Sequence, residues 1–304
     1  MKSYAKRKIA DRWQKEGIAL DHSQKYEEAI RSYNRVIKID PEHTDAWFGK
    51  GRAHHSLERY EEAIRCYDRV IKIDPKSNEA WLWKGFALRG LEKYEDAIRC
   101  FDKAIEIDPD GADVWYLWHS KGLILNILER YEEATGCFDK VFEIYPGYAD
   151  AWLWKGQTLH NLKKYEDAIK CYDKTIEIDP GLTEAWCNKG IILIILERYE
   201  DAIRLFDKLN KIAPDDAYVL SNRGLALHSM ERYDEAIKCY DKVIEVDPGY
   251  SDVWYTRGLL FHTLEKYEEA IICYDKVIDI DPEFADVWCG KALALHSLKK
   301  HHKY

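Results

Sequence analysis

The eight prolines of this 304-residue chain constrain its fold more than any other feature, because they recur at a fixed interval. Successive prolines are 34 residues apart at every step but one, where the interval is 37. They are Pro41, Pro75, Pro109, Pro146, Pro180, Pro214, Pro248 and Pro282. A period of this length is typical of a repeat protein built from small supersecondary units, and it outweighs chain length as a guide to domain number.

Further columns of residues keep the same period. A tyrosine stands 15 residues before each proline, an alanine follows three residues later, and a second aromatic follows four residues after the alanine. Upstream, most units carry Trp-x-x-x-Gly, as in Trp47 with Gly51 and Trp81 with Gly85. The second aromatics are Tyr33, Tyr67, Phe101, Phe138, Tyr172, Phe206, Tyr240 and Tyr274.

Within one unit the apolar residues recur at three- and four-residue spacing, which indicates two amphipathic helices of about a dozen residues each. The proline ends the second helix, because it lacks an amide donor and clashes with the preceding turn. Gly51 and Ala63 are small residues within otherwise bulky stripes, so they mark where the paired helices cross closely. One hairpin cannot bury its apolar stripe alone, and neighbouring hairpins are therefore expected to stack into a solenoid.

This pattern of Trp, Gly, Tyr, Ala, aromatic and Pro resembles the tetratricopeptide repeat family over about residues 10–298. The resemblance implies an all-α, right-handed superhelical α-solenoid of helix-turn-helix repeats. A lead-in of residues 1–9 would precede the repeats, and a capping helix and polar tail of residues 285–304 would follow them. One regular departure is that Lys50 and Glu58, and their equivalents, replace the family's Leu before the glycine and its Gly in the turn. The eight repeats would span 10–43, 44–77, 78–111, 112–148, 149–182, 183–216, 217–250 and 251–284.

The single 37-residue interval reflects three extra residues near Trp115 and Trp118. Trp115 keeps the usual spacing from the proline, whereas Trp118 keeps the usual spacing to Gly122. We expect the insertion to lengthen the first helix of this unit by about one turn at its start. Two interpretations remain open: a bend or protrusion that exposes Trp115 or Tyr116 to a partner, or neutral variation in length at a helix end.

The family resemblance also implies that the first helices of successive hairpins line a concave binding groove. Its first half is aromatic and apolar, which suits an extended or helical peptide with bulky side chains. Trp83 and Trp154 are expected to face this groove, since Trp81 and Trp152 already fill the core column, although packing between hairpins is the alternative. The groove residues carried over are Phe48, Arg52, His55, Leu82, Trp83, Phe86, Arg89, Leu153, Trp154, Gln157, His160, Asn188, Asn222, His228, Tyr255 and His262.

Two polar features of the groove bear on its ligand. Asn188 and Asn222 are asparagines in adjacent units, of the type that family members use to hold a peptide backbone. Some members bind a chaperone's C-terminal carboxylate through a Lys/Asn/Arg clamp across three hairpins. Arg52 and Arg89 alone do not reproduce that clamp, so a chaperone tail is disfavoured as the ligand.

Cysteine and histidine columns invite a chemical interpretation but do not support one. Cysteines in adjacent hairpins would lie ~8–10 Å apart, beyond the ~7 Å limit for a disulfide, so we interpret them as small buried hydrophobes. The histidines occur one per hairpin and cannot converge on one ion, so they are interpreted as polar rim residues and no metal site is predicted. The cysteines are Cys66, Cys100, Cys137, Cys171, Cys239 and Cys273, and the histidines are His55, His160, His228, His262 and His296.

Several classes of function are excluded by composition and by missing motifs. The chain has 46 basic and 55 acidic residues and a net charge of −9, which argues against nucleic acid as a partner. It contains no phosphate-binding glycine loop, no HExxH motif and no nucleophile elbow, so no enzyme activity and no cofactor are predicted. No apolar run is long enough to cross a membrane and no export signal is visible, which favours the cytoplasm.

The sequence therefore predicts a cytoplasmic, cofactor-free scaffold that binds a segment of another protein in its groove, as a monomer or with weak self-association. Two alternatives remain. The chain could be a self-assembling structural protein whose ends or outer faces stack, or a regulator that holds a small ligand or a metal.

Overall fold

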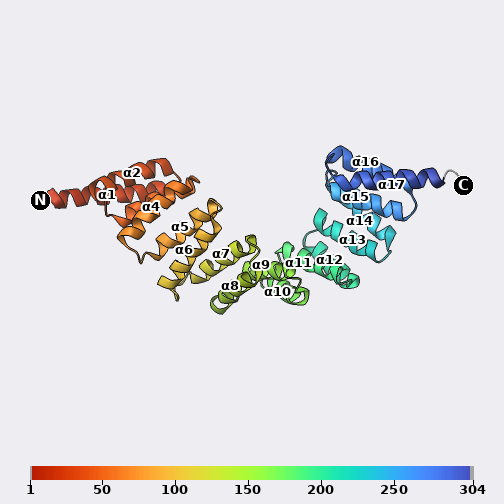
Figure 1. Ribbon diagram of the computed structural model, residues 1–304, viewed down its shortest axis with the longest axis horizontal. Coiled ribbons are helices and arrows are strands. Elements are labelled where there is room, and N and C mark those ends of the chain that lie inside the picture. The colour runs from red at the N-terminus through yellow and green to blue at the C-terminus, as the bar shows by residue number, and fades with distance from the viewer. Residues whose placement is uncertain (1, 302–304) are drawn as a thin grey trace. The chain divides into compact units, whose positions relative to one another are not determined.

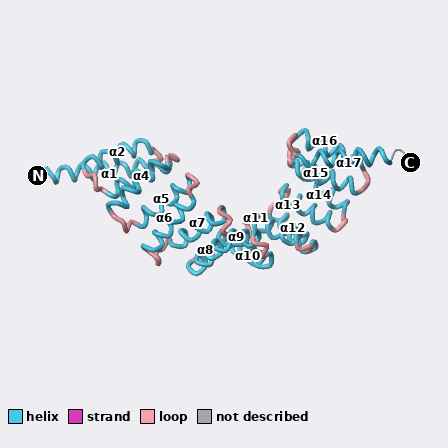
Figure 2. Tube along the Cα trace, in the orientation of Figure 1, coloured by secondary structure: helices cyan, strands magenta, loops and turns pink. Residues whose placement is uncertain are grey.

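A computed structural model describes the backbone of residues 2–301 and the side chains of residues 7–301. Within that range every regular element is an α-helix, and the helices are joined by short turns (Figures 1 and 2). The chain forms two compact units, Met1–Thr158 and Leu159–Tyr304. The expected all-α fold of helix-turn-helix repeats is confirmed.

Seventeen helices in residues 2–301 form eight hairpins and one further helix. Apart from α1, the first helix of each hairpin has 13 residues, or 14 in α7, and the second always has 14. Residues 2–9 continue the first helix rather than standing apart from it. The helices are α1 (Lys2–His22), α2 (Tyr26–Ile39), α3 (Thr44–Ser56), α4 (Tyr60–Ile73), α5 (Asn78–Gly90), α6 (Tyr94–Ile107), α7 (Val114–Ile127), α8 (Tyr131–Ile144), α9 (Ala149–Asn161), α10 (Tyr165–Ile178), α11 (Thr183–Ile195), α12 (Tyr199–Ile212), α13 (Ala217–Ser229), α14 (Tyr233–Val246), α15 (Ser251–Thr263), α16 (Tyr267–Ile280) and α17 (Ala285–His301).

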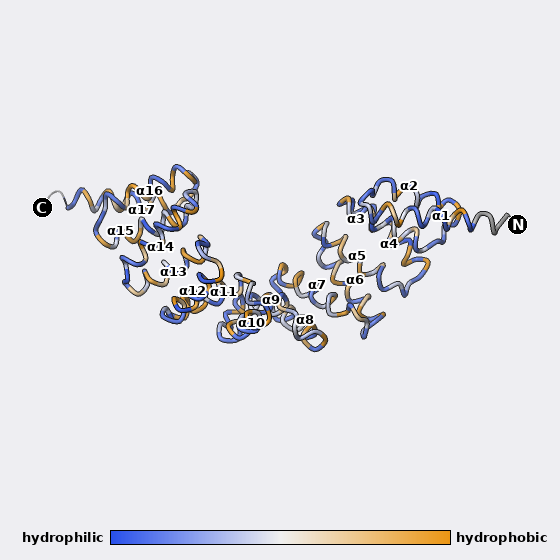
Figure 3. The backbone as a smooth tube through the Cα atoms, turned by 180° about the vertical axis from the view of Figure 1, so that it is seen from behind, coloured by the Kyte–Doolittle hydropathy of each residue, from blue (hydrophilic) through white to orange (hydrophobic). Residues whose placement is uncertain are grey.

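A close contact between glycine and an aromatic ring sets the spacing of the two helices in each hairpin. The second aromatic of the hairpin, such as Tyr67 or Phe101, is fully buried, and it lies against the glycine of the first helix. A Cβ atom on Gly51 would lie 2.6 Å from the Tyr67 ring, and one on Gly85 would lie 2.5 Å from the Phe101 ring. Only glycine therefore allows the ring to approach so closely. Hydrophobic and hydrophilic residues alternate along the helices (Figure 3).

The tryptophan and proline columns are joined by a hydrogen bond. The indole N–H of Trp47 donates to the carbonyl oxygen of Pro41 at 2.9 Å, and Trp81 donates to Pro75 at 3.2 Å. The bond spans the turn that connects one hairpin to the next, so it fixes how the new first helix leaves the old second helix. The same bond is made by Trp152, Trp186, Trp254 and Trp288.

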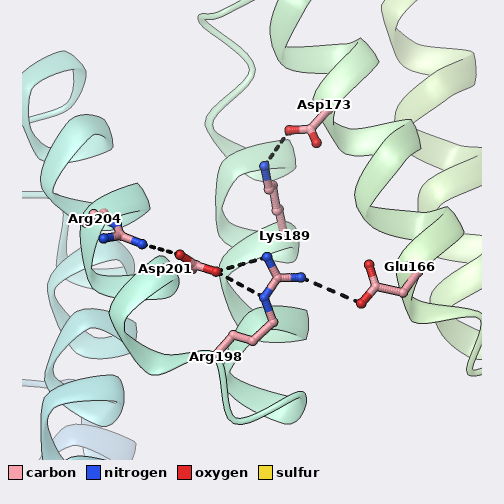
Figure 4. Close-up of polar contacts among 6 residues, drawn as sticks. All are labelled: Glu166, Asp173, Lys189, Arg198, Asp201 and Arg204. Carbon is pink, nitrogen blue, oxygen red and sulfur yellow. Dashed lines mark hydrogen bonds and ion pairs between the residues drawn. The ribbon is translucent and has the colours of Figure 1, made fainter.

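Ion pairs between consecutive hairpins use the lysine or arginine before each glycine. Lys189 of α11 reaches back to Asp173 of α10 at 2.5 Å (Figure 4). In the same view Arg198 pairs with Asp201 of α12 at 2.9 Å and with Glu166 of α10 at 3.6 Å. Equivalents of the Lys189 pair are Lys84–Asp68, Lys121–Asp102, Lys155–Asp139, Arg223–Asp207, Arg257–Asp241 and Lys291–Asp275.

The turn inside each hairpin places a non-glycine residue in the left-handed backbone region. Glu58 has a φ of 57° and Glu231 a φ of 59°. These are the positions at which the family usually has glycine. A left-handed L-residue costs roughly 1–2 kcal/mol, so each such turn is held by the packing of the two helices it connects.

The three-residue insertion lies mainly in a loop, so the expectation of an extra helical turn is wrong. The connection before α7 spans residues 108–113, whereas the equivalent connection before α5 spans residues 74–77. Helix α7 itself gains one residue over α5. The loop takes up the other two residues because the aspartate- and glycine-containing segment 108–113 forms turns more readily than helix.

The outer face of α17 also differs from the expectation that it would be polar. Trp288 is 51% exposed, Leu293 61% and Leu295 40%. Asp286 lies in the first turn of α17, and Lys299 and Lys300 lie in its last turn. Trp288 and Leu295, seven residues apart, lie on one side of the exposed face, and Leu293 lies at its other edge. An exposed face of this kind is the one that the second helix of another hairpin would cover.

Helix α7 has a buried histidine, His119, at a position that is leucine in the two flanking hairpins. His119 is 6% exposed, lies 5.1 Å from the Tyr148 ring, and has no hydrogen-bond partner on either ring nitrogen among the described residues. Burial lowers its pKa from 6.5 to about 4. The equivalent residues in the flanking hairpins are Leu82 and Leu153, which shows that the position accepts an apolar side chain.

Two glycines of the first unit should respond to alanine in opposite directions. Gly85→Ala places a methyl group against Phe101 and should lower the free energy of unfolding by about 1–3 kcal/mol. Gly136 lies inside α8 with nothing within 4 Å of an added Cβ, so Gly136→Ala should raise it by about 0.5–1 kcal/mol. Urea denaturation followed by circular dichroism measures both. Similar stability for the two variants would contradict the ring-contact role of the glycine column.

His119 should make the stability of the protein depend on pH. The folded state keeps the imidazole neutral, whereas the unfolded chain binds a proton below pH 6.5. The free energy of unfolding is therefore highest above pH 6.5 and falls as the pH decreases towards 4, by up to about 3 kcal/mol. His119→Leu should remove this part of the dependence in urea denaturation between pH 7 and 4.5. His296→Leu, at an exposed position, should leave it unchanged.

Candidate functional site

Four aromatic rings from three consecutive first helices form a continuous surface in the first unit. His55 of α3 meets Trp83 of α5 edge to face at 5.3 Å. Trp83 contacts Phe86 of the same helix at 6.0 Å, and Phe86 contacts Tyr116 of α7 at 5.6 Å. We call these four residues the aromatic strip.

The strip combines buried and accessible rings. Phe86 is 9% exposed and anchors the strip to the core, whereas Tyr116 is 39% exposed. Trp83 and His55 are half-buried. The arrangement leaves ring edges and faces open to solvent on a rigid helical support, which suits contact with a second molecule.

Two arginines flank the strip and give it positive charge. The guanidinium of Arg52 lies 5.6 Å from the Trp83 ring, and that of Arg89 lies 5.3 Å from the Phe86 ring. Arg52 also pairs with Asp21 at 3.4 Å. Arg89 has no carboxylate partner within the described side chains, so its charge is available to a ligand. Burial, and secondarily the charge of Arg89, lowers the pKa of His55, which keeps that ring neutral at pH 7.

The strip and its two flanking arginines include five of the sequence-predicted groove residues, namely Arg52, His55, Trp83, Phe86 and Arg89. The remaining predicted groove residues of the first unit lie outside the aromatic strip. Phe48 packs 5.9 Å from the Tyr67 ring, Leu153 is 5% exposed, and Leu82 and Trp154 are half-buried against the core. The Gln157 side-chain oxygen is buried.

In the second unit, the predicted groove residues do not form a comparable cluster. The Asn222 amide donates to the Tyr218 carbonyl of its own helix at 2.8 Å, and Asn188 is half-buried. Tyr255 packs between two rings, 6.0 Å from Tyr274 and 5.0 Å from Phe284.

The histidine column has a local packing role. Each of four histidines contacts the tyrosine that begins the second helix of its own hairpin. His55 lies 5.3 Å from Tyr60, and His228 lies 5.8 Å from Tyr233. His160 with Tyr165 and His262 with Tyr267 repeat the contact. The four histidines therefore pack the end of the first helix against the start of the second helix in their hairpins.

Sequence reasoning missed two features. The insertion marked Tyr116 as a residue that could be exposed to a partner, but the contact of its ring with Phe86, which completes the aromatic strip, was not predicted. The hairpin-to-hairpin ion pairs were missed as well. Their signal was an aspartate column that precedes the lysine or arginine column by 16 residues in most hairpins, as Asp173 precedes Lys189.

The titratable groups offer little reactive chemistry. None of the eight cysteines is in a disulfide, and seven are buried. Burial raises the pKa of Cys66, Cys100 and Cys137 to about 11, which keeps these thiols protonated and unreactive. Within residues 2–301 no three His, Cys, Asp or Glu side chains gather as a metal-binding group. No helix in that range is long and apolar enough to cross a membrane.

Solved structures with the same fold are similar over much of the chain. A tetratricopeptide repeat protein from Parabacteroides merdae ATCC 43184 superposes with a TM-score of 0.60 at 15% identity, over 83% of this chain and 98% of that one. The MamA protein gives 0.53 at 22% identity, over 57% and 92%. YrrB, described as a TPR protein with an unusual peptide-binding site, gives 0.53 at 24% identity, over 62% and 95%. A comparison with curated protein sequences finds no match.

Family models described as tetratricopeptide repeat match along most of the sequence. The matched segments are residues 15–78, 53–114, 116–148, 149–182, 171–204, 217–250 and 251–284. These segments coincide with the helical hairpins and their glycine–aromatic contacts. The chain belongs to the tetratricopeptide repeat family.

Proposed function

We propose that this protein is an interaction scaffold without enzymatic activity, and that its aromatic strip binds a peptide segment of a partner protein. The observation that carries the proposal is the continuity of rings from His55 to Tyr116 across three hairpins. A few partly desolvated aromatic side chains supply most of the affinity in many protein interfaces.

The charges beside the strip specify the ligand further. Arg52 and Arg89 stand over the rings, and a guanidinium pairs well with a carboxylate in two-point contact. The strip is therefore suited to a segment in which a bulky apolar side chain is adjacent to an aspartate or glutamate. That YrrB is described as having a peptide-binding site is in keeping with this role for the fold.

The other predicted groove residues are proposed as secondary contacts within their own unit. In the second unit, Leu225 and Leu259 are 39% and 38% exposed on first helices, and Asn188 lies on a third first helix. We also propose the cytoplasm as the compartment, in keeping with eight cysteines that form no disulfide.

Loss of Trp83 or Arg89 should weaken peptide binding. We suggest selecting ligands for the full chain from a displayed random peptide library and measuring their affinity by fluorescence anisotropy. Selected peptides should pair a bulky apolar residue with an acidic one. Trp83→Ala and Arg89→Ala should each reduce affinity about tenfold or more, as expected for interface anchors.

Tyr218→Ala is the matched control, because Tyr218 is a 45% exposed aromatic on a first helix of the other unit. It should bind the same peptides with unchanged affinity. Higher salt should weaken binding to the wild type more than to Arg89→Ala, since screening acts on the charge pair. Peptides that bind all variants equally would rule out the strip as the site.

Self-association is a second candidate function, favoured by the exposed apolar side chains Trp288, Leu293 and Leu295 on α17. The helix has Asp286 in its first turn and Lys299 and Lys300 in its last. Two copies of α17 packed antiparallel would bury these apolar side chains in a closed twofold dimer. Asp286 of each copy would then lie near Lys299 and Lys300 of the other copy.

Sedimentation velocity over a range of concentrations tests this interface. The average mass should rise with concentration for the wild type, and Leu293→Glu should abolish the rise by burying a charge. Leu259→Glu changes the equivalent leucine one hairpin earlier and should leave the association intact. A wild type that stays monomeric throughout would eliminate this candidate.

A further inference from the structure

Two departures from the repeat meet at one place in the first unit. The three-residue insertion places Trp115 at the start of α7, seven residues before Gly122, where the other hairpins have no ring. Tyr145 occupies the position before the proline that is aspartate in six of the eight hairpins. Although they lie 30 residues apart in sequence, the two rings are 5.6 Å apart.

Tyr148 completes a cluster with these two residues. Its ring lies 4.9 Å from Trp115 and 5.9 Å from Tyr145. The two tyrosine rings are within 10° of parallel, and the tryptophan stands nearly perpendicular to both. Tyr145 is 47% exposed. The two tyrosine rings are therefore stacked in parallel, and Tyr145 presents an exposed ring that Tyr148 and Trp115 support.

The electrostatic setting of the cluster is negative. Burial, together with the nearby carboxylate of Asp150, raises the pKa of Tyr148 to about 12. Asp113 immediately precedes α7, and Asp110 lies in the inserted loop. Aromatic faces and carboxylates both attract cations.

The cluster lacks the cation that accompanies other tryptophans of the same unit. Arg35 lies 4.0 Å from the Trp13 ring, Lys50 lies 5.3 Å from Trp47, and Lys84 lies 5.4 Å from Trp81. Trp83 and Trp118 have Arg52 and Lys121 over their rings in the same way. Among residues 7–301, no lysine or arginine stands over Trp115, Tyr145 or Tyr148.

We infer that Trp115, Tyr145 and Tyr148 form a binding site for an arginine side chain of a partner, with Asp150 beside it. A guanidinium is flat, weakly hydrated and able to stack on open aromatic faces while its edge donates to a carboxylate. A lysine ammonium is compact and strongly hydrated, so it gains less binding energy from contact with an aromatic ring face. A quaternary ammonium is held best by rings that enclose it, and these rings contact one another instead of surrounding a space.

This site adjoins the aromatic strip, because the rings of Trp115 and Tyr116 are 5.6 Å apart, but the two sites differ in charge. The strip carries arginines and selects acidic segments, whereas the cluster carries carboxylates and selects a basic side chain. Either can be present without the other, and the two are tested with different ligands and different variants.

Nuclear magnetic resonance of the full chain can test the site with small probes. The indole N–H signal of Trp115 is identified by its absence in Trp115→Phe. N-acetylarginine amide should shift this signal at millimolar concentrations, and N-acetyllysine amide should bind about threefold or more weakly. N-acetylcitrulline amide, which has the same shape as the arginine probe without its charge, should cause no comparable shift.

Tyr145→Ala should weaken the arginine probe about fivefold or more, the scale of a cation–π contact at an exposed site. Tyr218→Ala, at a similarly exposed tyrosine of the other unit, should bind the probe as the wild type does. Equal shifts with the citrulline probe, tighter binding of tetramethylammonium than of arginine, or unchanged affinity in Tyr145→Ala would each overturn the assignment. The peptides selected for the aromatic strip serve as a folding control, because they should bind Tyr145→Ala normally.

Discussion

The contact between a first-helix glycine and a second-helix ring is the constraint on which the rest of this structure depends. Because a Cβ atom at Gly51 would lie 2.6 Å from Tyr67, the helices can approach only where the side chain is absent. Each buried ring then occupies the centre of its hairpin, and the residues one turn away on the first helix point outward at a fixed spacing. The aromatic strip exists because three such hairpins, with the same separation, place His55, Trp83 and Tyr116 in line.

The polar contacts between hairpins act on geometry more than on stability. Lys189 and Asp173 pair at 2.5 Å, but the aspartate side chain is 53% exposed, and pairs of this kind contribute at most about 1 kcal/mol. The indole bond from Trp47 to the Pro41 carbonyl is similarly exposed. Apolar burial supplies most of the stability, since it involves every hairpin and no solvent competes for it. The ion pairs and indole bonds select one way of stacking among several that would bury similar area.

Much of the fold could be predicted from the sequence, because the same pattern of apolar residues, glycine and proline occurs in eight repeats. The proline column located the ends of the second helices, and α4 does end at Ile73, two residues before Pro75. The insertion was misplaced because periodicity cannot tell whether extra residues join a helix or a loop. The candidate site was less predictable for the same reason. Trp83 and Phe86 could be assigned to one helix face, but contact with Tyr116 depends on the irregular hairpin.

Specificity in such an array has to arise where the repeat is broken, since identical hairpins present identical surfaces. The fourth hairpin concentrates the breaks: an insertion before α7, a glycine within α8, and Tyr145 in place of aspartate. None of these changes touches the glycine–ring contact, as Gly122 still lies against Phe138. The core of the hairpin is thus kept while its edge is altered, which allows Trp115, Tyr145 and Tyr148 to gather at the surface without loss of the stack. A surface altered under an intact core is what recognition of one particular partner requires.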